Sequence, residues 1–109
     1  MANAVSRAVL EVLLDRINQG AAALSPEGEL VYLNQRLATL LGRTRAQLVG
    51  KPLAELVAEA DREALAEALE AGRHGTSQCR ITVLGSDFRA LIVFAPLGHG
   101  QLSCLITAQ

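Results

Sequence analysis

Aromatic side chains and net charge are both scarce in this sequence. It contains one Tyr, two Phe and no Trp, and 10 basic residues against 11 acidic ones leave a formal net charge of −1. Binding along a nucleic-acid backbone needs a basic stripe, which the sequence lacks. So few rings also offer little stacking surface to a flavin. The composition therefore argues against nucleic acid as a partner and against a flavin as a cofactor.

Cysteine and long hydrophobic runs are scarce as well. The two cysteines lie far apart in the chain, which is not the pattern of a disulfide framework. No apolar run approaches the ~20 residues needed to cross a bilayer, and charged residues interrupt the N-terminal stretch. A chain of 109 residues, half of them apolar, can bury a core without metals or disulfides. The sequence therefore predicts one cytoplasmic domain with no membrane span.

Residues 1–19 predict a helix with a wide apolar face. Arg7, Glu11 and Asp15 gather on one narrow side, whereas apolar side chains spread over roughly 200° of the remainder. A helix on one surface needs an apolar arc of only ~100° or a little more, so we expect contacts with its own domain and with a second copy. A helix buried within one chain is the alternative. The expected dimer contacts are Val5, Val9, Val12, Leu13 and Ile17.

Residues 20–109 are expected to form the domain proper, beginning with a hairpin and a helix. The stretch "SPEG" separates two apolar runs, and Pro26 and Gly28 suit the turn between two strands. Asn34 is expected to end the second strand and to cap a helix in "QRLATLL". Gly42 is expected to end that helix.

Further capping signals predict more short helices. Thr44 and Gln47 have the spacing of a capping box, and Pro52 suits the first position of a helix in "PLAELV". Asp61 is expected to cap the helix in "ADREALAEALEAG", and Gly72 to stop it.

The last third of the chain changes from helical to alternating periodicity. Three alternating runs, separated by the turn sequences "LGSD" and "LGHG", indicate three strands. A helix, two strands, short helices and three more strands predict an α+β fold. We expect a five-stranded antiparallel sheet with short helices on one face and the N-terminal helix on the other.

The outer face of that sheet is expected to be apolar. Leu91, Val93 and Leu105 alternate with residues that point inward. Left bare, they would form the kind of apolar patch that monomers avoid. We therefore add these three residues to the expected interface of a two-fold homodimer.

The order of the motifs resembles one known family. The run "VYLNQRLATLLGRTRAQLVGKPLAEL", with its Y-x-N, LLG and G-x-P elements, is similar to the PAS domain family over about residues 20–108. The resemblance implies a sensory and dimerisation module that feeds an effector such as a kinase or cyclase. Members often end in Asp-Ile-Thr before an output helix. Here Leu105, Ile106 and Thr107 stand at those positions, so the Asp is missing.

The resemblance does not extend to the cofactor motifs of the family. Haem-sensing members carry a His on the last helix before the long strands, and residues 59–71 contain none. Light-sensing flavin members carry a Cys in a polar motif at the start of that helix, which has no counterpart here. His74 and His99 could meet at one end of the sheet, but zinc needs three or four ligands. No cofactor and no metal site are expected.

Catalysis and a disulfide are also not expected. The acidic residues in 55–70 recur at helical spacing, as on a solvated face, and no serine has a base at a recognisable spacing. The family's strand order would put one strand between those of Cys79 and Cys104. That separation of ~9.5 Å exceeds the reach of a disulfide.

The short helices and the concave sheet face imply a pocket that is almost wholly apolar. Such a wall disfavours a polar ligand, because each buried polar atom left unpaired costs ~1–3 kcal/mol. The pocket is either a filled core or a site for a small apolar molecule. We expect a non-catalytic sensory and dimerisation module, with a receptor for an apolar ligand as the alternative. The candidate pocket residues are Leu33, Leu37, Leu41, Leu65, Leu69, Cys79, Ile81, Ile92 and Ile106.

Overall fold

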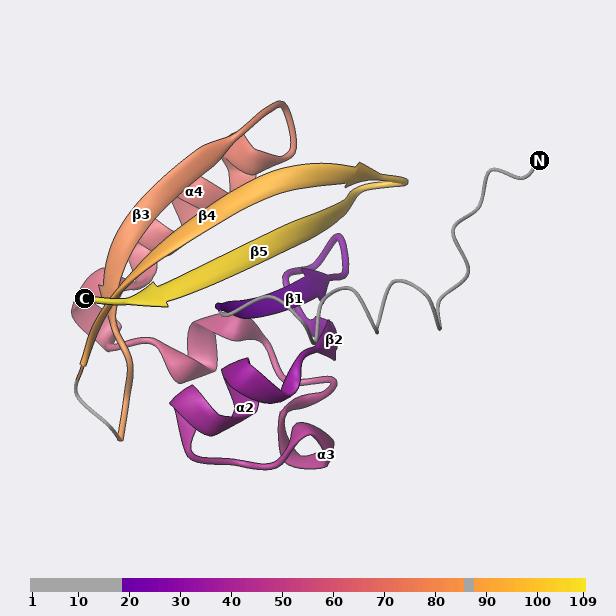
Figure 1. Cartoon of the computed structure of the whole chain (residues 1–109). Coiled ribbons are helices and arrows are strands. Elements are labelled where there is room, and N and C mark those ends of the chain that lie inside the picture. Colours follow the sequence, from indigo (N-terminus) through magenta and orange to yellow (C-terminus); the bar gives the residue numbers. More distant parts are fainter. Residues whose placement is uncertain (1–18, 86–87) are drawn as a thin grey trace.

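The computed structural model describes residues 19–85 and 88–109. Its centre is a sheet of five antiparallel strands in the order β2-β1-β5-β4-β3, as Figure 1 shows. The predicted α+β fold with a five-stranded antiparallel sheet is therefore confirmed. The expected N-terminal helix lies outside the described residues, apart from Gln19. The strands are β1 (Gly20–Leu24), β2 (Leu30–Leu33), β3 (Ser77–Thr82), β4 (Arg89–Gly98) and β5 (Gln101–Ala108).

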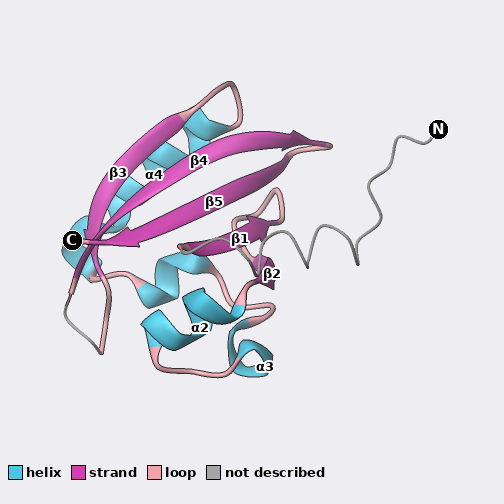
Figure 2. Ribbon diagram, in the orientation of Figure 1, coloured by secondary structure: helices cyan, strands magenta, loops and turns pink. Residues whose placement is uncertain are grey.

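The helices between β2 and β3 lie against one face of the sheet (Figure 2). They are short, and no helix in the described part is long and apolar enough to cross a membrane. The elements are α2 (Gln35–Leu41), α3 (Arg45–Leu48), the 3₁₀ turns η1 (Leu53–Leu56) and η2 (Glu59–Asp61), and α4 (Arg62–Gly72).

Local capping follows the sequence prediction at α2 and α3. The Asn34 side chain accepts a hydrogen bond from the Leu37 N–H, and Gly42 ends α2 in the left-handed conformation at φ 70°. Thr44 and Gln47 form the predicted capping box at α3. These groups satisfy backbone donors and carbonyls that a helix end leaves unpaired.

Two positions differ from the prediction, and a third has an additional role. Pro52 precedes η1 in an extended conformation and is not its first helical residue. Asp61 precedes α4, but its side chain makes no capping bond there. Instead its Oδ2 accepts from the Thr82 N–H at 2.9 Å. α4 ends at Gly72 as expected, but a Cβ there would lie 2.8 Å from the Phe94 Cβ, so close packing demands this glycine.

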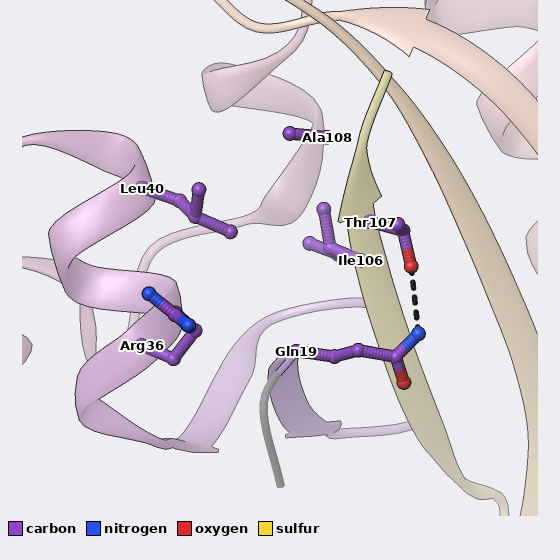
Figure 3. Close-up of a pocket in the computed structure, with 6 residues that line it drawn as sticks. All are labelled: Gln19, Arg36, Leu40, Ile106, Thr107 and Ala108. Carbon is purple, nitrogen blue, oxygen red and sulfur yellow. Dashed lines mark hydrogen bonds between the residues drawn. The ribbon is translucent and has the colours of Figure 1, made fainter.

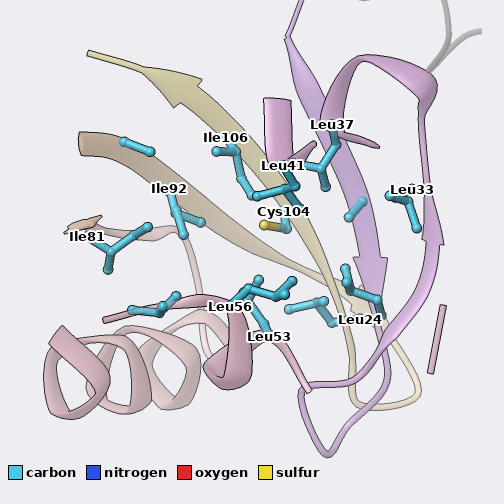
Figure 4. Close-up of a cluster of buried hydrophobic side chains, with 14 of the residues drawn as sticks. Leu24, Leu33, Leu37, Leu41, Leu53, Leu56, Ile81, Ile92, Cys104 and Ile106 are labelled. Carbon is cyan, nitrogen blue, oxygen red and sulfur yellow. The ribbon is translucent and has the colours of Figure 1, made fainter. Parts of the chain in front are cut away.

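The core fills the space between the helices and the inner face of the sheet (Figure 4). Along β4 and β5, buried residues alternate with less buried ones, because successive strand side chains point to opposite faces. Phe94 is the largest of the fully buried side chains. The helices and strands thus share one hydrophobic core.

Candidate functional site

Asn34 connects the start of β1, the end of β2 and the start of α2. Its Oδ1 accepts from the N–H of Ala21 at 3.0 Å and from the N–H of Leu37 at 2.9 Å, while its Nδ2 donates to the Gln19 carbonyl at 2.9 Å. The side chain is fully buried. Because a buried amide must use its polar atoms, this set of bonds fixes the abrupt turn from strand to helix. Asn34 thereby holds Gln19, the residue that precedes β1.

Gln19 also contacts the last strand. Its Nε2 donates to the Thr107 Oγ1 at 3.0 Å, as the dashed line in Figure 3 shows. The strands on either side of this contact are direct neighbours, with Gly20 opposite Ile106. The start of β1 and the end of β5 are therefore joined at one place.

A hollow of about 210 Å³ lies beside this contact, between α2 and the end of β5. Figure 3 shows its lining side chains, which combine a guanidinium, an amide and a hydroxyl with aliphatic carbon. None of the six carries a carboxylate, imidazole or thiol. The hollow therefore offers hydrogen bonds and apolar contact but no acid–base pair. It is lined by Gln19, Arg36, Leu40, Ile106, Thr107 and Ala108.

The nine candidate pocket residues lie in or against the hydrophobic core. Two of them, Leu69 and Cys79, are partly buried and pack against the rest. Only Ile106 is shared with the hollow described above. The nine residues are thus core residues in this structure, and their role as a ligand site stays a prediction. The other members of the set, all buried, are Leu33, Leu37, Leu41, Leu65, Ile81, Ile92 and Ile106.

The outer face of the sheet carries the three described residues of the predicted interface. Val93 on β4 stands opposite Leu105 on β5, which in turn stands opposite Ala21 on β1. Leu91 lies two residues before Val93 on the same face of β4, opposite Thr107. Leu91, Val93 and Leu105 are each half-buried. The five residues predicted from the N-terminal helix lie outside the described residues: Val5, Val9, Val12, Leu13 and Ile17.

The two cysteines are free thiols on strands separated by β4. Burial raises the pKa of the Cys104 thiol strongly. The pKa of Cys79 is also raised, first by partial burial and then by the negative charge of Asp61. A raised pKa keeps both thiols protonated, and thiols are poor nucleophiles in that form.

The histidines are placed apart from any ligand cluster. His74 Nε2 lies 3.4 Å from an oxygen of Glu70, on the exposed surface. His99 lies in the turn between β4 and β5, at a positive φ of 55°. Within the described residues, no three His, Cys, Asp or Glu side chains gather as a metal site would require.

Sequence reasoning missed the hollow. Leu40 belongs to the LLG element, but no motif marked it, Gln19 or Arg36 as lining a site. Gln19 meets Thr107 because β1 pairs with β5. No local signal could indicate this contact, because 88 residues separate Gln19 from Thr107 in the sequence. The predicted strand order could have indicated that the two ends of the domain are neighbours, but not the hydrogen bond.

Solved structures of low sequence identity share this fold. The PAS domain of an HTR-like protein from Haloarcula marismortui is 15% identical, with a TM-score of 0.77 over 94% of this chain and 90% of that one. A domain of a sensory box sensor histidine kinase/response regulator from Geobacter sulfurreducens is 17% identical, with a TM-score of 0.78 over 91% and 90%. A PAS domain from a two-component sensor histidine kinase is 14% identical, with a TM-score of 0.76 over 92% and 93%.

A family-level comparison gives the same result. The comparison with curated proteins gave no match. The PAS fold matches residues 9–106, which is most of the chain, and the strand order and capped short helices agree with that match. The chain therefore belongs to the PAS fold family.

Proposed function

We propose that this domain is a non-catalytic sensory and dimerisation module of a signal-transduction protein. Two copies pair through the outer sheet face and the segment 1–19. The signal is a change in packing at that interface. No chemical step is part of the proposal, and the cysteines and histidines described above support none.

The apolar outer face of the sheet is the observation that carries this proposal. Val93 and Leu105 stand opposite each other on neighbouring strands, and Leu91 lies beside them; Ala21, next in the row, is already buried at 1% exposure. Each Å² of apolar surface that a dimer removes from water stabilises the dimer by about 25 cal/mol. A second copy of the same face is a suitable cover, because two-fold symmetry pairs a patch with itself.

The contacts of Gln19 give that interface a connection to the inside of the domain. The Gln19 carbonyl is bound by the Asn34 amide, and its side chain is bound to Thr107. A shift of the segment before Gln19 therefore acts on α2 through Asn34 and on β5 through Thr107. This couples the flanking segment to both layers of the fold.

The partner outside this chain is proposed to be an effector domain of a two-component type. Two of the similar structures come from sensor histidine kinases, which suggests this class first. A kinase, cyclase or similar domain acting in the cytoplasm would fit a module of this kind.

The test is the molar mass of the protein in solution, measured by light scattering over a dilution series. We compare the unchanged chain with Val93→Glu and with Val9→Glu/Leu13→Glu. Val49→Glu is the matched control, because Val49 is 51% exposed at the end of α3 and is not part of the sheet. We expect a dimer that both interface variants convert to a folded monomer, while the control stays dimeric. A monomeric unchanged chain would contradict the proposal.

A receptor for a small apolar molecule is the second candidate. The observation in its favour is that Leu40, Ile106 and Ala108 present aliphatic carbon to the hollow of about 210 Å³. Thermal unfolding with and without added indole tests it. A rise in Tm that Leu40→Asp abolishes would support the receptor, whereas an unchanged Tm up to millimolar indole would contradict it for this probe.

A further inference from the structure

The two edges of the sheet differ in how their backbone groups are satisfied. At the β2 edge, the Leu30 N–H donates to the Lys51 carbonyl at 2.9 Å and the Leu30 carbonyl accepts from the Gly50 N–H at 2.7 Å. That edge is thus covered by the segment after α3. At the β3 edge, the described residues cover only the Thr82 end: the Thr82 carbonyl accepts from the Ala58 N–H, and the Thr82 N–H donates to Asp61.

The phase of the ladder shows where the other backbone groups of β3 point. Thr82 stands opposite Arg89 on β4 but directs both of its backbone groups away from β4. In an antiparallel pair such residues alternate with those bonded into the ladder, so Arg80 and Gln78 share this direction. Among the described residues, the N–H and C=O groups of Gln78 and Arg80 have no backbone partner. Two donor–acceptor pairs therefore face outward in strand geometry.

We propose that the β3 edge from Gln78 to Arg80 is a docking site for an extended segment of another protein. The segment adds beside β3 as a sixth strand. The pattern of the free groups specifies this kind of occupant, because alternate residues of an extended chain supply matching donors and acceptors. The backbone groups of this edge are separate from the outer sheet face of the proposed dimer, although the Arg80 side chain borders that face, opposite Leu91.

The side chains beside this edge define the chemistry of the segment. Arg80 is exposed on the outer face, where its Nε donates to the Gln109 side chain. An acidic residue opposite Arg80 forms a favourable cross-strand pair. A second copy of the chain would instead bring its own Arg80 close to this one. The charge therefore favours a foreign acidic strand over self-pairing.

The inner side of the edge is formed by α4. Leu69 of α4 and Arg73, which directly follows α4, face the β1–β2 turn, where Arg73 donates to the Pro26 carbonyl. Ala64 and Ala71 lie on the opposite flank of the helix and are exposed. Their small side chains add little bulk to this flank, where the exposed Glu67 lies between them along the helix, and we expect apolar residues on the inner side of an added strand. The expected segment therefore alternates acidic and apolar residues.

The probe is the synthetic peptide acetyl-Val-Glu-Val-Glu-Val-amide, added to the ¹⁵N-labelled full chain and followed by NMR. We expect the largest shift changes at the amides of Gln78 and Arg80, with hydrogen exchange at least tenfold slower there. The amides of Cys79 and Ile81 already point to β4 and are expected to change less. Largest changes at the outer sheet face or the hollow would overturn the proposal, and so would no changes at millimolar peptide.

Two methylated peptides separate strand addition from loose charge attraction. The proposed strand runs antiparallel to β3, so a Glu opposite Arg80 directs its N–H toward β3, and methylation of the two Glu amides is expected to abolish binding. The Val amides face solvent, so we expect their methylation to change the dissociation constant by no more than about threefold. Equal binding of both peptides would contradict the added strand.

Variants of the protein complete the test. Arg80→Pro removes one outward donor without breaking a bond to β4, and such edge positions tolerate proline. We expect it to weaken binding at least tenfold. Arg80→Glu keeps the backbone, and we expect it to bind the Glu peptide about tenfold less tightly and a Lys analogue more tightly. A dimer of the unchanged chain that Arg80→Pro abolishes would overturn the proposal and assign this edge to a second copy.

Discussion

The carboxylate of Asp61, at the start of α4, accepts the backbone N–H of Thr82 at the edge of β3, at 2.9 Å. The same Oδ2 lies 3.4 Å from Arg89 Nη1, which also donates to the Thr82 hydroxyl. This carboxylate thus ties a helix start to a sheet edge. Asp61→Ala leaves the N–H without its charged acceptor, and we expect a loss of about 1–3 kcal/mol in the free energy of unfolding. Urea unfolding measures this loss, with the exposed Glu63→Ala as the control. Equal losses in the two variants would argue against a stabilising Asp61–Thr82 hydrogen bond.

Asn34 is expected to be among the most sensitive polar positions. Asn34→Leu removes two acceptor bonds and one donor bond and leaves the Ala21 and Leu37 N–H groups without their acceptor. At about 1–3 kcal/mol for each unsatisfied buried group, the variant should lose at least ~2 kcal/mol. Urea unfolding measures this, with Gln35→Ala on the exposed side of α2 as the control. A loss no larger than that of the control would show that the amide is dispensable.

Gly72→Ala tests close packing against helix propensity. Alanine favours a helix by ~1 kcal/mol over glycine. The added Cβ, however, would lie 2.8 Å from the Phe94 Cβ, and relieving that contact requires the backbone to move. Overpacking of this kind costs about 1–3 kcal/mol, so we expect a net decrease in Tm. Gly75→Ala is the matched control, because no atom lies within 4 Å of its new Cβ. An increase in Tm for Gly72→Ala would contradict the packing argument.

The turn between β4 and β5 should accept a stabilising change. His99 and Gly100 both have positive φ, at 55° and 79°, between the paired residues Gly98 and Gln101. A two-residue turn of this kind favours Asn-Gly, because Asn tolerates the left-handed conformation better than most side chains. We expect His99→Asn to raise Tm by a few degrees and His99→Val to lower it. The reverse order in calorimetry would exclude this account of the turn.

The buried thiol predicts a dependence of stability on alkaline pH. The pKa of Cys104 is raised above its ordinary value of 9.0 by burial, so the native state keeps a proton that the unfolded chain releases. Above about pH 9 the unfolded state binds fewer protons, and the free energy of unfolding falls by up to ~1.4 kcal/mol per pH unit. Urea unfolding from pH 7 to pH 10 measures this slope. Cys104→Ala should reduce it, and an equal slope in that variant would assign it to other groups.

The local part of the fold could be predicted from the sequence, because each signal and its partner lie within a few residues. Asn34 caps α2 three residues away, and Thr44 caps α3 in the same way. The alternation along β4 and β5 gave the inner and outer faces correctly, because a strand has a fixed period of two. These signals were sufficient for the fold class.

The contacts that could not be predicted join distant parts of the chain. Asp61 was expected to cap its own helix, but the same carboxylate serves Thr82, 21 residues away. Gly72 was assigned to a helix stop, and only the position of Phe94 shows that a side chain would not fit. The same limit hid the contact of Gln19 with Thr107. Side chains of this kind depend on tertiary geometry, which residue type and spacing do not specify.

The placement of β1 beside β5 has a mechanical consequence. The strands are antiparallel, with Gly20 opposite Ile106, so the two ends of the domain leave the same end of one strand pair. Tension applied through the flanking segments would open this pair one rung at a time, as in a zipper, and would not shear all rungs together. The Gln19–Thr107 contact would be the first to break. A small pulling force at the two ends of the domain would therefore change the hollow before it disturbs the core.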